Sequence, residues 1–153
     1  MKKTAPLLLF LLMTCLLCAG CGAAPDFEPA ELAEKLEGSG CFTDLLSEMD
    51  QSMALELYGL SESDVVQCAV YLGTGATAEE IAVFKAASAS AAKTVAEALT
   101  ARRDSQIAAY KNYVPAEVPK LESAIVKSSG AYAVYVTSAD ADGAAKIVSD
   151  YMK

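Results

Sequence analysis

The sequence contains no histidine and no tryptophan. Without histidine, Ser-His-Asp and Cys-His nucleophile pairs cannot form, and nearly all catalytic zinc sites are excluded. Only carboxylate, lysine, tyrosine or thiol chemistry remains, and no pair of carboxylates stands at a defined catalytic spacing. We therefore expect no enzymatic activity, no metal site and no cofactor.

Basic residues are also scarce. Twelve lysines and arginines stand against 20 aspartates and glutamates, which gives a formal net charge of −8. An acidic domain is repelled by phosphate backbones, so we expect no nucleic-acid binding. Anionic lipid headgroups repel it too, and membrane attachment would therefore have to come from acyl chains.

The first 21 residues have the composition of a targeting segment. Lys2 and Lys3 precede an apolar run over residues 7–18, which is too short for a membrane-spanning helix of roughly 20 residues. The run ends at Ala19-Gly20-Cys21, where small residues precede a cysteine, although Cys18 stands where leucine is commonest in a lipobox. We interpret residues 1–20 as a lipoprotein signal peptide.

In this interpretation Cys21 becomes the first residue of the mature chain and carries diacylglycerol. Two or three acyl chains would hold the protein on the outer face of the cytoplasmic membrane. Residues 21–28 are expected to form a short lipidated tether, in which residues 22–26 (GAAPD) are small and flexible. Residues 29–153 have the length of a single domain.

The domain begins with helical signals. Proline at Pro29, acidic residues in the next turn and Gly38 indicate a short amphipathic helix over residues 29–38. Residues 41–60 mix apolar and acidic residues without clean periodicity, and we expect helical turns there.

Strand signals follow. Residues 65–72 are β-branched and alternating, and a glycine turn comes next. Residues 77–80 (TAEE) resemble a helix capping box, but an internal repeat favours a strand over residues 81–86. The repeat is AVFK at 82–85 and AAKTV at 91–95, matched by AVYV at 133–136 and AAKIV at 144–148.

Each repeat contains a strand, a turn, a second strand and a helix. The helices are expected over residues 88–112, before Pro115, and from Asp140 to the C-terminus. The sequence thus predicts an α+β fold: a four-stranded, largely antiparallel sheet from two strand-turn-strand-helix repeats. The two principal helices would pack on one face of the sheet, and the short N-terminal helices would flank it or cover the other face.

Both faces of the predicted sheet are apolar. Alternation assigns Val66, Cys68, Val70, Ile81, Val83, Tyr132, Val134 and Val136 to one face, and Ala69, Tyr71, Ala82, Phe84, Ala133 and Tyr135 to the other. If the N-terminal helices do not cover the second face, Tyr71, Phe84 and Tyr135 would form an exposed aromatic patch that binds a partner.

Two further features leave alternatives open. Arg102 and Gln106 lie one helical turn apart and are followed by Tyr113, so they form either a polar ligand pocket or a structural contact that fixes the turn at Tyr113. Cys41 and Cys68 either pair or remain free thiols, and we favour free thiols. Asp140 and Asp142 are expected to cap a helix.

Several motifs taken in order resemble one family. They are Tyr58-Gly59-Leu60, residues 75–83 (GATAEEIAV), Arg102 with Gln106, residues 113–117 (YVPAE) with residues 120–122 (KLE), and Gly130-Ala131-Tyr132. Together they resemble the small Gram-positive lipoproteins that carry domain of unknown function 4358, over roughly residues 30–153. The resemblance implies a membrane-anchored α+β domain, no assigned activity and no catalytic residue.

We therefore expect a non-catalytic binding or assembly module with an envelope protein as partner. The alternative is a small-ligand sensor or enzyme accessory with a polar pocket near Arg102, Gln106 and Tyr113.

Overall fold

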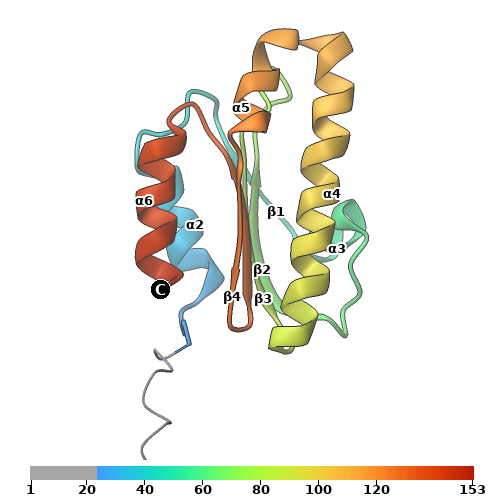
Figure 1. Ribbon diagram of the computed structural model, residues 1–153, viewed down its shortest axis with the longest axis vertical. Helices are drawn as coiled ribbons and strands as arrows, with labels where there is room; N and C mark the ends of the chain where they lie inside the picture. Colours follow the sequence, from blue (N-terminus) through green and yellow to red (C-terminus); the bar gives the residue numbers. More distant parts are fainter. Residues whose placement is uncertain (1–23) are drawn as a thin grey trace, which may run out of the picture.

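The computed structural model describes residues 24–153, and the predicted signal peptide and Cys21 lie outside this part of the chain. The described residues form a mixed α+β fold (Figure 1). Its strands are β1 (Ser47–Met49), β2 (Val65–Leu72), β3 (Glu80–Ala86), β4 (Ile125–Ser129) and β5 (Tyr132–Thr137). Its helices are α2 (Pro29–Glu37), α3 (Gln51–Tyr58), α4 (Ala89–Tyr113), α5 (Val118–Glu122) and α6 (Ala141–Tyr151), and a single 3-10 turn (Pro115–Glu117) precedes α5.

The sheet is open and has five strands in the order β1-β2-β3-β5-β4, with every neighbouring pair antiparallel. The four predicted strands are present, and β1 is an additional one. Helical turns were expected over residues 41–60, but only α3 is helical there. Ser47–Met49 instead pairs with Val70–Leu72 of β2, since sheet pairing overrides the weak local preference of such a short segment.

The predicted placement of the two principal helices is wrong. Figure 1 shows α4 with α3 on one face of the sheet and α6 with α2 on the other. Both faces of the central strands are apolar, so each face needs a covering layer. The two strand-turn-strand-helix segments therefore place their helices on opposite faces and are not structural copies of one another.

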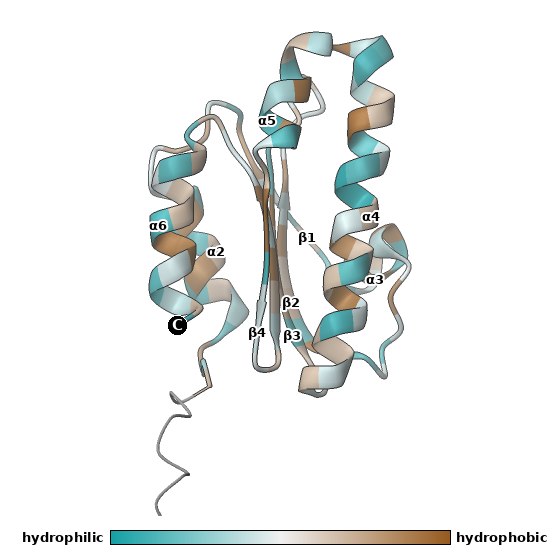
Figure 2. Ribbon diagram, viewed as in Figure 1, coloured by the Kyte–Doolittle hydropathy of each residue, from teal (hydrophilic) through white to brown (hydrophobic). Residues whose placement is uncertain are grey.

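Two cores result, one on each side of the sheet. The core under α2 and α6 includes Leu32, Leu36, Ile81, Val83, Tyr132, Val134, Val136 and Val148. The core under α3 and α4 includes Leu55, Tyr58, Val70, Ala82, Phe84, Val95, Leu99 and Tyr135. In Figure 2 the strands are mostly brown or pale, whereas α4 alternates between teal and brown along its length, as expected of a helix with one buried side.

Local sequence signals define the ends of these elements. The Ser88 side chain accepts a hydrogen bond from Ala91 N (3.0 Å) and caps α4, which ends just before Pro115. Asp140 caps α6 by accepting from Gly143 N (2.9 Å), so its predicted capping role is confirmed, whereas Asp142 lies within the first turn of α6 and is not the cap. Gly130 has φ +56° in the two-residue turn between β4 and β5, a conformation that favours glycine.

Candidate functional site

Two adjacent glutamates are buried at the start of β3. Glu79 and Glu80 are each only 2% exposed. Successive side chains of an extended chain point to opposite sides, and Glu80 lies on the α4 side with Ala82 and Phe84. A buried carboxylate is costly unless it is paired and hydrogen-bonded, so the neighbours of each glutamate decide what it does.

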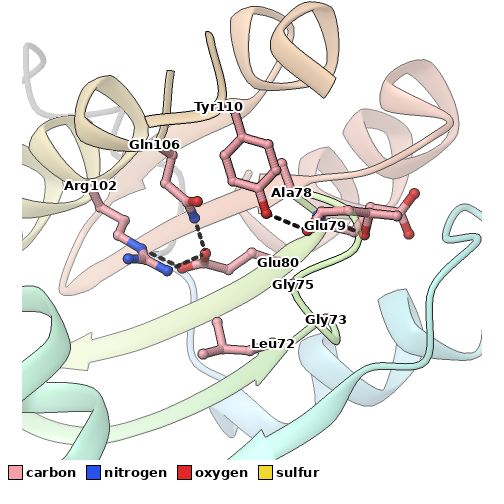
Figure 3. A pocket seen from close by; sticks show the side chains of 10 residues that line it. Leu72, Gly73, Gly75, Ala78, Glu79, Glu80, Arg102, Gln106 and Tyr110 are labelled. Atoms are coloured by element: carbon pink, nitrogen blue, oxygen red, sulfur yellow. Dashed lines mark hydrogen bonds and ion pairs between the residues drawn. The ribbon is translucent and has the colours of Figure 1, made fainter. Parts of the chain in front are cut away.

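Glu80 is held by α3 and α4. Its Oε1 accepts from Arg102 Nε (3.2 Å) and from the Tyr58 hydroxyl, and its Oε2 accepts from Arg102 Nη2 (3.0 Å) and Gln106 Nε2 (2.6 Å). Figure 3 shows Arg102 and Gln106 reaching from adjacent turns of α4 to this one carboxylate. Four donors occupy its two oxygens, so Glu80 has no free oxygen with which to act as a base.

This network also fixes the protonation of its donors. Burial together with the negative charge of Glu80 raises the pKa of Tyr58 well above its ordinary value. Desolvation alone would lower the pKa of Arg102, but Glu80 outweighs it and raises that pKa. Tyr58 therefore stays a phenol and Arg102 stays a cation at physiological pH.

Glu79 is held from the opposite side. It accepts from Thr43 N (2.7 Å), Thr43 Oγ1 (2.7 Å), Asp44 N (2.9 Å) and Lys120 Nζ (2.9 Å), and Lys120 also pairs with Glu117 (3.1 Å). Desolvation tends to raise the pKa of Glu79, but these donors outweigh it and lower that pKa. Glu79 thus ties α5 and the loop between α2 and β1, which we name the N-terminal loop, to the start of β3.

The loop between β2 and β3 is fixed by Asp44. The carboxylate of Asp44 accepts from Thr74 N (2.9 Å) and Thr77 Oγ1 (2.9 Å). A Cβ on Gly73 would lie 2.7 Å from Asp44 Oδ2, so a side chain does not fit there without displacing that carboxylate. Gly75 adopts φ +88° within the same loop.

A small polar pocket of about 170 Å³ opens between this loop and α4. It is lined by Leu72, Gly73, Gly75, Thr77, Ala78, Glu79, Glu80, Arg102, Gln106 and Tyr110 (Figure 3). Arg102 Nη1 makes no hydrogen bond within the part of the chain that the structure describes. Arg102 thus brings a fixed cation with one unused donor to the pocket lining, and the pocket volume lies below the roughly 300 Å³ at which ordinary small-molecule sites begin.

The polar residues predicted from the sequence are only partly brought together. Arg102 and Gln106 line the pocket, but Tyr113 is 69% exposed at the end of α4 and does not line it. Tyr110 takes the place expected for Tyr113, and its hydroxyl donates to Thr77 O (2.7 Å). Sequence reasoning missed Glu80, for which the available signal was two acidic residues at the start of an apolar strand.

The aromatic patch, which was expected only if the second face of the sheet stayed uncovered, is not formed. Phe84 and Tyr135 are fully buried under α4, whereas Tyr71 lies on the other face beside the core of α2 and α6. The sequence analysis placed Tyr71 on the same face as Phe84. In the sheet Tyr71 pairs with Ile81 and Cys68 pairs with Phe84, so it is Cys68 that shares a face with Phe84. Alternation within β2 cannot reveal which residues of β3 stand opposite. Moreover, a bulge at Val66 shifts the pairing within the strand.

A second hollow lies along the free edge of the sheet, beside β1 and α3. One part, of about 290 Å³, is lined by Ser47–Asp50, Met53, Leu72 and Gly73. The adjoining part, of about 330 Å³, is lined by Met49, Met53, Glu56 and Leu57. Because Met49 and Met53 line both parts, we treat them as one groove and name it the methionine groove.

Comparisons with known proteins identify a family but no characterised relative. No curated protein and no solved structure matches the chain. Among the described residues, no helix is both long and apolar enough to cross a membrane. The family model described as Domain of unknown function (DUF4358) matches residues 40–138, a span that includes both buried glutamates, the polar pocket and the methionine groove. As this span is 99 of the 153 residues, the chain belongs to the DUF4358 family.

Proposed function

We propose that this protein is a lipoprotein on the outer face of the cytoplasmic membrane, in keeping with the Gram-positive lipoproteins that its motifs resemble. We propose further that its domain is a non-catalytic binding or assembly module. The anchor is supported by Lys2 and Lys3, the apolar run over residues 7–18 and the Ala19-Gly20-Cys21 ending.

A non-catalytic role is supported by the state of the two buried glutamates. Each accepts four hydrogen bonds from donors that belong to the fold. A general acid or base needs an oxygen that can reach a substrate. Glu79 and Glu80 serve instead to fasten α4, α5 and the N-terminal loop to the sheet.

The methionine groove is the observation that carries the binding role. Met53 is 55% exposed and Leu57 36% exposed, so apolar side chains are open to solvent beside the sheet edge. Methionine is flexible and polarisable, and it adapts to varied apolar side chains. A groove of this kind beside an edge strand suits a peptide segment of another protein.

The charge around the groove defines the partner's chemistry. Between Lys35 and Lys85 the sequence contains no lysine or arginine but nine acidic residues. Glu79 and Glu80 are paired internally, whereas Glu48, Asp50 and Glu56 line the groove itself. We therefore assign the groove to a segment of an envelope protein that combines apolar side chains with lysine or arginine.

A defined peptide tests this assignment. A fluorescent amphipathic Leu/Lys peptide should bind the domain in an anisotropy titration, and a matched Leu/Glu peptide should not. Met53→Asp should weaken binding of the Leu/Lys peptide even though it adds an attractive charge, because it removes an apolar contact. Val66→Asp is the control, since Val66 is 61% exposed and does not line the groove. Equal effects of the two substitutions would contradict the assignment.

The second candidate function is recognition of a small anion in the polar pocket. The unused Nη1 of Arg102 supports it, and the volume limits the ligand to a few atoms. Formate or acetate should then raise the thermal midpoint of the wild type but not of an Arg102→Lys variant, which keeps a cation beside Glu80 but lacks Nη1. No shift in the wild type would remove this candidate.

A further inference from the structure

The last residues of the predicted tether are bound to the domain. The ring of Phe27 stacks on Tyr132, with centroids 4.2 Å apart and 18° between the planes. It also meets Tyr151 edge-on at 5.1 Å. We call residues 24–27 the strap.

Polar contacts hold the strap as well. Phe27 N donates to the Tyr132 hydroxyl oxygen (3.0 Å), and that hydroxyl donates to Phe27 O (2.6 Å). Asp26 pairs with Lys85 at 3.1 Å. Tyr132 itself is only 1% exposed, so the strap is attached to a side chain that belongs to the core.

The strap lies at one end of the sheet. At this end, Lys85 of β3 pairs with Tyr132 of β5. At the other end, Glu80, where β3 begins, pairs with Thr137, where β5 ends. These two pairs lie five residue steps apart along each strand, which corresponds to about 17 Å. In Figure 1 the chain enters at the end where β4 turns into β5, and α5 lies at the other end.

The turn between β4 and β5 touches the strap directly. A Cβ built on Gly130 would lie 3.2 Å from Ala24 Cβ and 3.4 Å from Pro25 Cδ. Ala24 follows Cys21 by three residue steps, and three steps of extended chain span at most about 11 Å. A tether that stayed free up to residue 28 would reach more than twice as far.

We infer that the strap sets the orientation of the domain on the membrane, with the turn at Gly130 toward the lipid headgroups and the polar pocket facing away. The inference rests on the lipid anchor at Cys21 proposed above. With Phe27 bound, the domain cannot rotate about a long tether. The start of the methionine groove at Ser47 is then presented away from the lipid too, because Ser47 pairs with Leu72 and Leu72 pairs with Glu80.

Fluorescence quenching tests this orientation, and the absence of native tryptophan makes each introduced indole a unique reporter. Ala131→Trp places it in the β4–β5 turn, and Ala76→Trp places it in the loop beside the pocket. The acylated full chain is reconstituted in phosphatidylcholine vesicles that contain a headgroup-nitroxide lipid. Quenching should be several-fold stronger for Ala131→Trp than for Ala76→Trp.

The strap is tested by combining each of the two reporters with Phe27→Ala, which should remove most of the difference in quenching between them. Tyr132→Phe keeps the stacked ring but loses the hydroxyl contacts, and it serves if Phe27→Ala fails to fold. Equal quenching of both reporters on vesicle-bound protein overturns the orientation alone. An unmodified Cys21 by mass spectrometry, with no binding to vesicles, overturns both the orientation and the anchor.

Discussion

Two neighbouring glutamates connect most of the elements at one end of the molecule. Burial of a carboxylate is unfavourable, and here each one is compensated by a cation and by further donors, three for Glu79 and two for Glu80. An apolar pair at these positions would give a core without directional contacts. The glutamates instead define where α4 and α5 attach to β3.

Arg102 and Arg103 are adjacent in the sequence, but Arg102 pairs with a buried carboxylate and Arg103 with an exposed one. Arg102→Met leaves Glu80 buried without its cation, and we expect a loss of about 3–5 kcal/mol in the free energy of unfolding. Arg103 pairs with Asp104 at the surface, with side chains 30% and 59% exposed, so Arg103→Met should change the free energy by about 0–1 kcal/mol. Urea unfolding of both variants provides the measurement, and similar losses would contradict the structural role of Glu80.

The lowered pKa of Glu79 leads us to expect that the free energy of unfolding depends on pH. Its pKa in the folded protein lies below the ordinary value of 4.5, so its stabilising effect is present above pH 4.5 and is lost as the pH falls through the lower, folded value. Glu79→Gln should be less stable than the wild type at pH 7. It should also lose less stability on acidification, as followed by urea unfolding between pH 7 and pH 3. A parallel decline in both proteins would show that other groups control the acid response.

At the scale of elements, the sequence was sufficient for most strands and helices. Alternation and turn glycines located β2 to β5, and capping and proline signals located α2, α4 and α6. Features that depend on pairing between strands were not predictable. The segment β1 is a strand only because it pairs with β2, and the bulge at Val66 hid the register between β2 and β3. In the same way, Arg102 and Lys120 were visible as cations, but only the folded arrangement shows which glutamate each one binds.

The N-terminus of α4 provides a prediction at this scale. Ser88→Ala removes the side-chain acceptor for Ala91 N and should destabilise the protein by about 1 kcal/mol. Ser90→Ala, two residues further on and exposed, has no capping bond to lose and should be neutral or slightly stabilising. Thermal unfolding distinguishes the two, and equal midpoints would show that the cap is dispensable.

For the molecule as a whole, the sheet separates the two cysteines of the domain. Cys41 belongs to the core under α2 and α6, and Cys68 packs against the core under α3 and α4. Burial raises the pKa of Cys68 to about 11. Peptide mapping after alkylation should find both thiols free without reductant, and Cys68 should react slowly at pH 8 and faster as the pH approaches 11. A peptide that links Cys41 to Cys68 would contradict the two-layer arrangement.

The residues that match the family model are not all of the residues that the layered fold needs. The family match at residues 40–138 ends short of α2 on one side and of α6 on the other, and these are the two helices that cover one face of the sheet. A fragment trimmed to the match would expose Ile81, Val83, Val134 and Val136 to water. Such a fragment should aggregate, so a fragment for biochemical work on this domain should retain both α2 and α6.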